Sequence, residues 1–285
     1  MLLIFLNYKM FKYISGNTYK HSIQKGADYI LKNKLPIINY AVESNNNPLK
    51  IFNQYSLLLN NLPDNRFSIA LKLSSVNFDL NYVNRIINMA REKEIKVIID
   101  AEDSYNNNTY QKCMNELIYF DKTLTNLPDK QFRKTFKTYQ MYRKDSLDQL
   151  TSDMSMCKKL NIPFNAKLVR GAYWNSEYNN GELFTNKNDT DNSYNNAIFE
   201  IYNNSKNQEC DVILATHNEF SAKFGKQLNK DNIFTFAHLQ GMKEKFYDDF
   251  SDKVYVYIPY GPYSQMIPYL SRRLYENLDV IKHAL

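Results

Sequence analysis

Short apolar runs alternate with longer amphipathic segments along nearly the whole chain. Runs of this length, rich in β-branched and aromatic residues, are typical of β-strands. The sequence predicts eight of them, at 35–42, 67–73, 96–101, 134–140, 164–169, 211–216, 233–238 and 253–258. Helical periodicity follows several of these strands, as at 82–94, 145–160 and 193–205, and a helix over 18–32 precedes the first strand.

The spacing of the predicted strands favours a closed barrel. Strand starts recur about every 31 residues, which is the length of one βα unit in a (βα)8 TIM-type barrel. Alternating strands and helices indicate a parallel sheet, and an open doubly wound sheet is the alternative arrangement. We expect one α/β domain, a barrel over 35–285 preceded by a helical lead-in over 1–34. The Asn-rich stretches at 45–47, 106–108 and 179–192 are expected to be βα loops.

Composition and charge exclude several classes of protein. No apolar run approaches the roughly 18–20 residues that span a bilayer, and the apolar N-terminus lacks a signal-peptide cleavage site. We therefore expect a cytoplasmic protein, or one attached peripherally to the inner face of the cytoplasmic membrane. The net charge of +6 is spread along the chain, so it does not indicate a nucleic-acid binder.

Cofactor motifs are also missing from the sequence. Three scattered cysteines argue against disulfides and against a CxxC metal site. The histidines form no HxxxH or HExxH pattern, so we expect no metal. The seven glycines form neither GxGxxG nor a P-loop, so any nucleotide cofactor must be held in another way. The sequence contains no GxSxG motif, which is the motif that would indicate an α/β-hydrolase.

Polar side chains gather at the carboxyl ends of the predicted strands, where a barrel carries its chemistry. Lys72 lies inside the second strand, Asp100 ends the third, and His217 follows the sixth. Each has an ordinary structural interpretation: a lysine whose amine reaches the barrel rim, an aspartate that caps a helix, and a neighbour of a helix N-cap. A barrel brings all eight strand ends into one ring, which favours a shared site.

The run KLVRGAYW at 167–174 is the most informative strand end. Lys167 and Val169 share one face of the strand because side chains alternate. Gly171 and the alanine after it remove bulk, so that a flat ring could approach the backbone closely. Tyr173 and Trp174 then offer stacking surfaces. A positive group beside such a ring would favour its reduced, anionic form.

The segment 257–277 combines a strand end with an amphipathic helix. Ile267, Leu270 and Leu274 form an apolar stripe at helical spacing. The opposite side carries Tyr269, Arg272, Arg273 and Glu276. Adjacent guanidinium groups suit a bound carboxylate because arginine offers a planar fork of donors, although a solvated helix face has the same pattern.

Several of these segments resemble the proline dehydrogenase family, including the proline dehydrogenase domain of bacterial bifunctional PutA proteins. The matching segments, in order, are IALKLSS at 69–75, IIDAED at 98–103, LVRGAYW at 168–174, ATHN at 215–218, LQGM at 239–242 and YLSRRLYEN at 269–277. The resemblance implies a distorted (βα)8 barrel, bound FAD, and oxidation of L-proline to Δ1-pyrroline-5-carboxylate. It also implies that the electrons pass to a membrane quinone.

By position, the resemblance assigns residues to the substrate and to the cofactor. The substrate residues it implies are the carboxylate-binding cations Arg272, Arg273 and Lys72, the tyrosines Tyr257 and Tyr269 around the proline ring, the active-site Asp100, and Glu43, which pairs with the first arginine. The FAD contacts it implies are Gln140, Lys167, Val169, Gly171, Ala172, Trp174, Thr185, Lys187, Thr216, His217, Asn218, Arg273 and Glu276.

The chain departs from the PutA pattern at Lys167, where those proteins carry arginine. Lysine keeps the charge but loses the planar fork, so the flavin potential is expected to differ. The resemblance also implies a monofunctional enzyme without an aldehyde dehydrogenase domain. Two other readings of the residues stay open: a barrel lyase or aldolase that uses Lys72 or Lys167 as a Schiff base, and a barrel that binds a ligand without catalysis.

Overall fold

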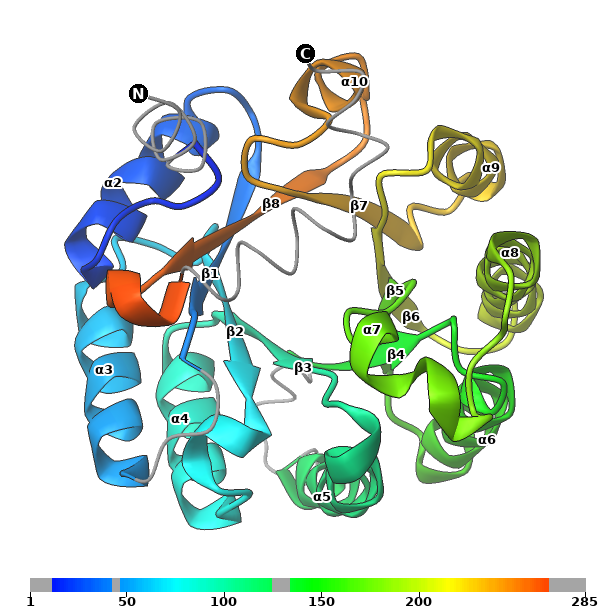
Figure 1. The fold of residues 1–285 in the computed structure, drawn as a ribbon, viewed down its shortest axis with the longest axis horizontal. Helices are drawn as coiled ribbons and strands as arrows, with labels where there is room; N and C mark the ends of the chain where they lie inside the picture. The colour runs from blue at the N-terminus through cyan, green and yellow to red at the C-terminus, as the bar shows by residue number, and fades with distance from the viewer. Residues whose placement is uncertain (1–11, 43–46, 125–133, 267–285) are drawn as a thin grey trace.

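A computed structural model describes residues 12–42, 47–124 and 134–266 of the chain. Their eight strands are β1 (Leu35–Tyr40), β2 (Ser68–Lys72), β3 (Lys96–Asp100), β4 (Thr135–Gln140), β5 (Phe164–Val169), β6 (Cys210–Ala215), β7 (Phe234–Leu239) and β8 (Val254–Tyr260). All are parallel, and β1 pairs with β8, so the sheet closes on itself (Figure 1). The expected (βα)8 barrel is confirmed, and the open-sheet alternative is wrong.

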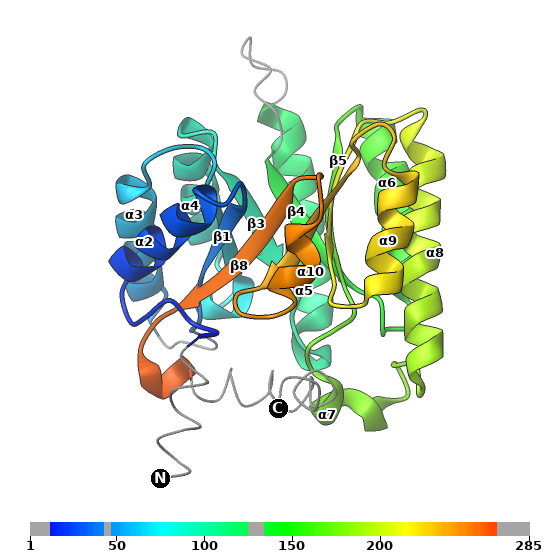
Figure 2. The same cartoon turned by 90° about the horizontal axis from the view of Figure 1, so that it is seen from above.

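Helices cover the outside of this barrel. They are α2 (Tyr19–Ile30), α3 (Pro48–Asn61), α4 (Leu80–Glu92), α5 (Ser104–Leu124), α6 (Ser146–Leu160), α7 (Trp174–Glu177), α8 (Lys187–Ser205), α9 (Glu219–Leu228) and α10 (Glu244–Asp248), with 3-10 turns at Leu73–Val76 and Tyr178–Asn180. The strands point towards the end of the barrel where α7 lies (Figure 2). None of these described helices is long and apolar enough to cross a membrane.

Apolar side chains divide between the barrel interior and the layer beneath the helices. Inside the barrel, Ile37, Ala70, Ile98, Phe136 and Ile213 form one buried cluster together with Ala237 and Tyr255. Two larger clusters lie between the strands and the surrounding helices. The interior residues alternate along each strand with residues of the outer layer, as the period of a β-strand requires. The same alternation carries the next inward-facing residues up to the open end of the barrel.

Asparagine takes the place of glycine at several turns and helix ends in this glycine-poor chain. Asn33, Asn77, Asn161 and Asn232 all adopt the left-handed backbone region, with φ between 52° and 57°. Asparagine is one of the few side chains that enters this region readily. Asn161, for example, ends α6 with its backbone amide directed at the carbonyl oxygens of Cys157 and Lys158. The chain thus uses asparagine where many proteins use a glycine to end a helix.

Two of the expected Asn-rich loops are wrong. Residues 106–108 lie in the first turns of α5, and 187–192 open α8. Asn106 instead donates from its backbone amide to Asp103, and the Asn186 side chain caps α8 by accepting from the amide of Asp189. Asparagine and aspartate favour helix starts as much as loops, which is why composition alone misplaced these segments. The predicted strand limits differ from the observed ones by up to two residues.

Candidate functional site

A cavity of about 430 Å³ opens at the carboxyl end of the barrel. Inward-facing residues of the strands form its floor, and the loop after β5 forms much of its wall. Of the candidates from the sequence, it is lined by Lys72, Asp100, Gln140, Lys167, Val169, Gly171, Ala172, Lys187, Thr216, His217, Asn218 and Tyr257. A cavity of this size, in which a few polar groups converge among apolar ones, is typical of small-molecule sites.

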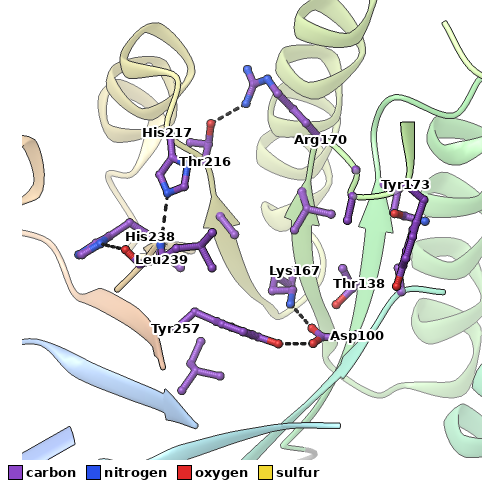
Figure 3. A pocket seen from close by; sticks show the side chains of 18 of the residues that line it. Asp100, Thr138, Lys167, Arg170, Tyr173, Thr216, His217, His238, Leu239 and Tyr257 are labelled. Carbon is purple, nitrogen blue, oxygen red and sulfur yellow. Dashed lines mark hydrogen bonds and ion pairs between the residues drawn. The ribbon is translucent and has the colours of Figure 1, made fainter. Parts of the chain in front are cut away.

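Asp100 joins three strands at the floor of this cavity (Figure 3). One carboxylate oxygen accepts from the Lys167 amine, and the other accepts from the Tyr257 hydroxyl at 2.5 Å. The Lys167 side chain is 6% exposed and that of Asp100 10%, so the pair is nearly dehydrated. The Lys167 amine also lies 5.3 Å from the centre of the Tyr257 ring. The two polar groups that meet Asp100 are therefore held in fixed positions.

Lys72 forms a second polar contact across the cavity. Its amine lies 2.5 Å from the Tyr173 hydroxyl and 5.1 Å from the centre of that ring. Behind it, the carboxylate of Glu102 accepts from the Ser74 amide at 2.8 Å. Burial raises the pKa of Glu102 above its usual value, and the nearby charge of Lys72 opposes this effect. A buried carboxyl thus lies close to a cation that faces the cavity.

Arg170 organises the side of the cavity between β5 and β6. Its guanidinium donates to Asp191 at 2.7 Å, to the Thr216 hydroxyl at 2.5 Å and to the Ser221 hydroxyl at 2.9 Å. Lys187 also donates to Asp191, at 2.5 Å. Burial acts to raise the pKa of the Asp191 carboxyl, but its hydrogen bonds from Lys187 and Arg170 outweigh burial and hold the pKa below its usual value. Two cations therefore share one carboxylate at this wall.

The residues after β6 serve both the fold and the cavity. His217 accepts on Nε2 from the Leu239 amide at 3.2 Å, which ties the end of β6 to β7. Asn218 caps α9 by accepting from the Ser221 amide at 3.1 Å. The ring of His238 stacks on Tyr247 in the layer between the strands and the helices. Both histidines border the cavity (Figure 3).

Other sequence candidates lie apart from the cavity or outside the described residues. Trp174 packs against Tyr142 with ring centres 6.5 Å apart, and Thr185 is exposed; neither lines this cavity. Glu43, Tyr269, Arg272, Arg273 and Glu276 lie outside the described residues.

Sequence reasoning did not assign Arg170 or Thr138 to the site, and gave Tyr173 only a stacking role. Thr138 was detectable, because it shares a strand face with Gln140. Arg170 and Tyr173 follow the end of β5, where alternation no longer sets the direction of a side chain. Among the described residues, no group of three histidine, cysteine, aspartate or glutamate side chains could hold a metal.

Comparison with known proteins places this geometry in a family. The family model described as proline dehydrogenase matches residues 17–283. Proline dehydrogenase 2, mitochondrial, of Arabidopsis thaliana is 34% identical over 207 residues, which cover 66% of this chain and 42% of that protein. Proline dehydrogenase 1, mitochondrial, of Dictyostelium discoideum is 28% identical over 262 residues, covering 84% of this chain and 44% of that protein. The chain thus spans less than half the length of these relatives.

A solved structure of proline utilization A from Bdellovibrio bacteriovorus, inactivated by N-propargylglycine, has the same fold. It superposes with a TM-score of 0.81 over 94% of this chain and 32% of that one, at 19% sequence identity. At this identity the likeness shows the barrel fold, while the family model covers nearly the whole sequence. The chain therefore belongs to the proline dehydrogenase family.

Proposed function

We propose that this protein is an FAD-dependent L-proline dehydrogenase that forms Δ1-pyrroline-5-carboxylate. One observation carries the proposal: of the described residues that the family resemblance assigned to substrate and to flavin, all except Trp174 and Thr185 line a single cavity. They come from strands far apart in the sequence, including Lys72, Asp100, Lys167 and Tyr257. Chance resemblance of short motifs gives no reason for them to converge. The carboxyl end of the barrel is also where such enzymes carry their chemistry.

The residues around the cavity suit a flavin. Gly171 lines the cavity with backbone alone, and it packs so closely on Tyr142 that a Cβ atom would lie 2.4 Å from that ring. The buried Thr138 hydroxyl has no hydrogen-bond partner among the described residues, so an atom of a bound molecule could satisfy it. Lys187 and Arg170 would hold the diphosphate, and Gln140, Lys167 and His217 the ring system.

The amino termini of two helices strengthen the diphosphate side of this arrangement. Helices α8 and α9 begin directly beside Lys187 and Asn218. The first turn of a helix offers unpaired amides and a partial positive charge, which favour phosphate. These features supply what a Rossmann or P-loop motif provides elsewhere, from different elements.

The opposite wall suits a small cyclic amino acid. Lys72 would bind the carboxylate, together with Arg272 and Arg273, and the rings of Tyr257, Tyr269 and Tyr173 would surround the apolar ring of proline. Lys72 and Lys167 also disfavour an added proton on the substrate amine, which has to be neutral to form a C=N bond. Bound FAD supplies the acceptor for the hydride that leaves C5. The chain contributes orientation and charge.

The electron acceptor that we propose is a membrane quinone, with the protein on the inner face of the cytoplasmic membrane. Exposed aromatic side chains support contact with a lipid surface: Tyr105 is 92% exposed, Phe220 70%, Tyr178 56% and Tyr263 44%. Each follows the carboxyl end of a strand, β3, β6, β5 and β8 respectively, so all four belong to the end of the barrel that carries the cavity. Tyrosine is favoured at membrane interfaces.

An absorption spectrum tests the substrate and the cofactor together. The purified protein should be yellow, with flavin absorption that L-proline bleaches under anaerobic conditions. D-proline is the stereochemical control. trans-4-Hydroxy-L-proline tests the choice between related substrates, because a hydroxyproline dehydrogenase of Bos taurus is also 27% identical to this chain. A colourless protein whose lysine is trapped by borohydride with a carbonyl compound would refute the proposal in favour of a Schiff-base enzyme.

Vesicle sedimentation tests the membrane contact. The wild-type protein should sediment with vesicles that contain anionic lipid, and Phe220→Ser with Tyr105→Ser should reduce the bound fraction. Leu31→Ser is the matched control, since Leu31 is 85% exposed at the end of α2, away from these loops. Equal binding by all variants would contradict the proposed surface.

A further inference from the structure

Glu177 is a buried carboxyl side chain that no part of the proposed chemistry uses. It ends α7 and is 2% exposed. One of its oxygens accepts from the backbone amide of Ser104, and the other accepts from the Tyr142 hydroxyl at 2.6 Å. A carboxylate buried to this extent is costly unless donors satisfy it. Both oxygens are satisfied by donors from different elements, so its position is well defined.

Tyr142 carries this contact to the loop after β5. Its ring fills the space beside Gly171, where a Cβ atom would be only 2.4 Å away. Its hydroxyl, which donates to Glu177, also accepts from the backbone amide of Tyr173 at 3.3 Å. Its own backbone amide donates to the carbonyl oxygen of Arg170 at 2.7 Å. Tyr142 therefore contacts this loop at Arg170, Gly171 and Tyr173, which all line the cavity.

Ser104 lies at the start of α5, four residues after Asp100 in the sequence. Its amide is bound by Glu177, and its hydroxyl accepts from Arg143 at 2.8 Å. Glu177 thus holds both the loop that follows Asp100 and, through Tyr142, the loop that carries Tyr173. Inside the cavity each of these two segments holds one lysine: Asp100 binds Lys167, and Tyr173 binds Lys72.

We propose that Glu177 is a positioning residue that fixes the distance between the two loops and so sets the affinity for the substrate. The inference rests on the proposed function, since it names the support of that same site. Glu177 does not touch the cavity; it acts through Tyr142 on one side and through the Ser104 amide on the other. The network crosses from the β5 side to the β3 side without passing through the cavity.

The test variant is Glu177→Gln, which keeps the shape of the side chain. A carboxylate accepts at both oxygens, whereas an amide has one acceptor oxygen and an NH₂ group that donates. In the variant, either the Ser104 amide or the Tyr142 hydroxyl proton therefore loses its acceptor. Tyr142→Phe removes the same link from the other end. The matched control is Glu182→Gln: Glu182 accepts from Arg143 at 3.0 Å, but its side chain is 48% exposed and lies apart from the cavity.

Both test variants should raise the KM for proline about tenfold, equivalent to about 1.4 kcal/mol of binding, with kcat within about threefold of wild type. The Kd of tetrahydrofuran-2-carboxylate, a ring acid that cannot be oxidised, should rise by the same factor. Glu182→Gln should leave both constants unchanged. A merely structural role predicts a lower Tm without this change in KM and Kd, and that result overturns the inference.

Hydrogen exchange gives a readout independent of activity. The amides of Ser104 and Tyr173 should exchange faster in Glu177→Gln and in Tyr142→Phe than in wild type or Glu182→Gln. If proline does not reduce the wild-type protein, the proposed function fails. The exchange data then still show whether Glu177 holds the two loops. If wild type is reduced by proline and Glu177→Gln keeps wild-type KM and exchange, the inference about Glu177 fails alone.

Discussion

The ion pair between Asp100 and Lys167 allows a quantitative prediction. Asp100→Asn keeps the shape of the side chain, and its amide oxygen can still accept from the Tyr257 hydroxyl. The change removes the charge that faces Lys167, whose side chain is 6% exposed. Breaking a buried ion pair costs about 3–5 kcal/mol. Because this pair borders a cavity that water can enter, we expect the lower end, about 3 kcal/mol.

The expected loss can be expressed as a change in activity. A penalty of about 3 kcal/mol on the arrangement that faces the substrate lowers its population by on the order of 100-fold. We therefore expect kcat/KM for proline to fall on the order of 100-fold, measured by steady-state reduction of a dye under anaerobic conditions. The Tm should fall by several degrees, because the same pair stabilises the fold.

A neighbouring carboxylate provides the control. Asp103 lies three residues further along the same loop and accepts from the backbone amide of Asn106 at 3.0 Å. Asp103→Asn retains an acceptor there and should keep kcat/KM within about twofold. If Asp100→Asn keeps kcat/KM within about threefold of wild type, the ion pair does not order the site. A double variant with Lys167→Met should show non-additive losses, since the two residues are in contact.

Three further predictions concern stability and cofactor content. Asp153→Asn removes the carboxylate that accepts from Lys137 at 2.5 Å, on the outer side of β4. The free energy of unfolding, measured in urea, should fall by about 3–5 kcal/mol. A loss below about 1 kcal/mol would show that the pair is not dehydrated. Burial lowers the pKa of His238 below 6.5, so the unfolded chain takes up that proton first as the pH falls. Stability should therefore fall below pH 6.5 by at most about 1.4 kcal/mol per pH unit for this group, and urea midpoints for His238→Gln should fall less steeply. Gly171→Ala places a Cβ against the Tyr142 ring at a φ of 140°, so the purified variant should contain less flavin, read as the ratio of visible to protein absorbance; wild-type flavin content would contradict this.

Much of the barrel was readable from the sequence because its signals are local. The periodicity of apolar residues located every strand, and their spacing predicted a closed (βα)8 barrel. The wrong predictions lie in polar segments, where composition alone had to distinguish a loop from a helix. At 106–108 and 187–192 the asparagines predict a loop, but these residues lie in the first turns of α5 and α8. Packing of a long helix against the barrel overrides the weak preference of asparagine for loops.

The prediction that polar residues at the strand ends face the cavity is correct for several of these residues, and for His238 it is correct only in part. Lys72, Asp100, Lys167 and Tyr257 face the cavity, as expected from residues near the carboxyl ends of strands. His238 has the same kind of position in the sequence and also borders the cavity, yet its ring stacks on Tyr247 in the outer layer. Alternation distinguishes the two faces of a strand, but the choice of inner face depends on the register of the whole barrel.

The sequence by itself determined the strand order, the barrel and the residues that carry charge at its open end, because these depend on local periodicity and on short motifs. Tertiary structure decided which of those charges pair. Asp100 and Lys167 are 67 residues apart in the chain and become partners only when the barrel closes. The contacts of Glu177 with Ser104 and Tyr142 arise in the same way. A buried carboxylate needs donors from whichever elements lie beside it, and closure of the barrel determines which elements those are.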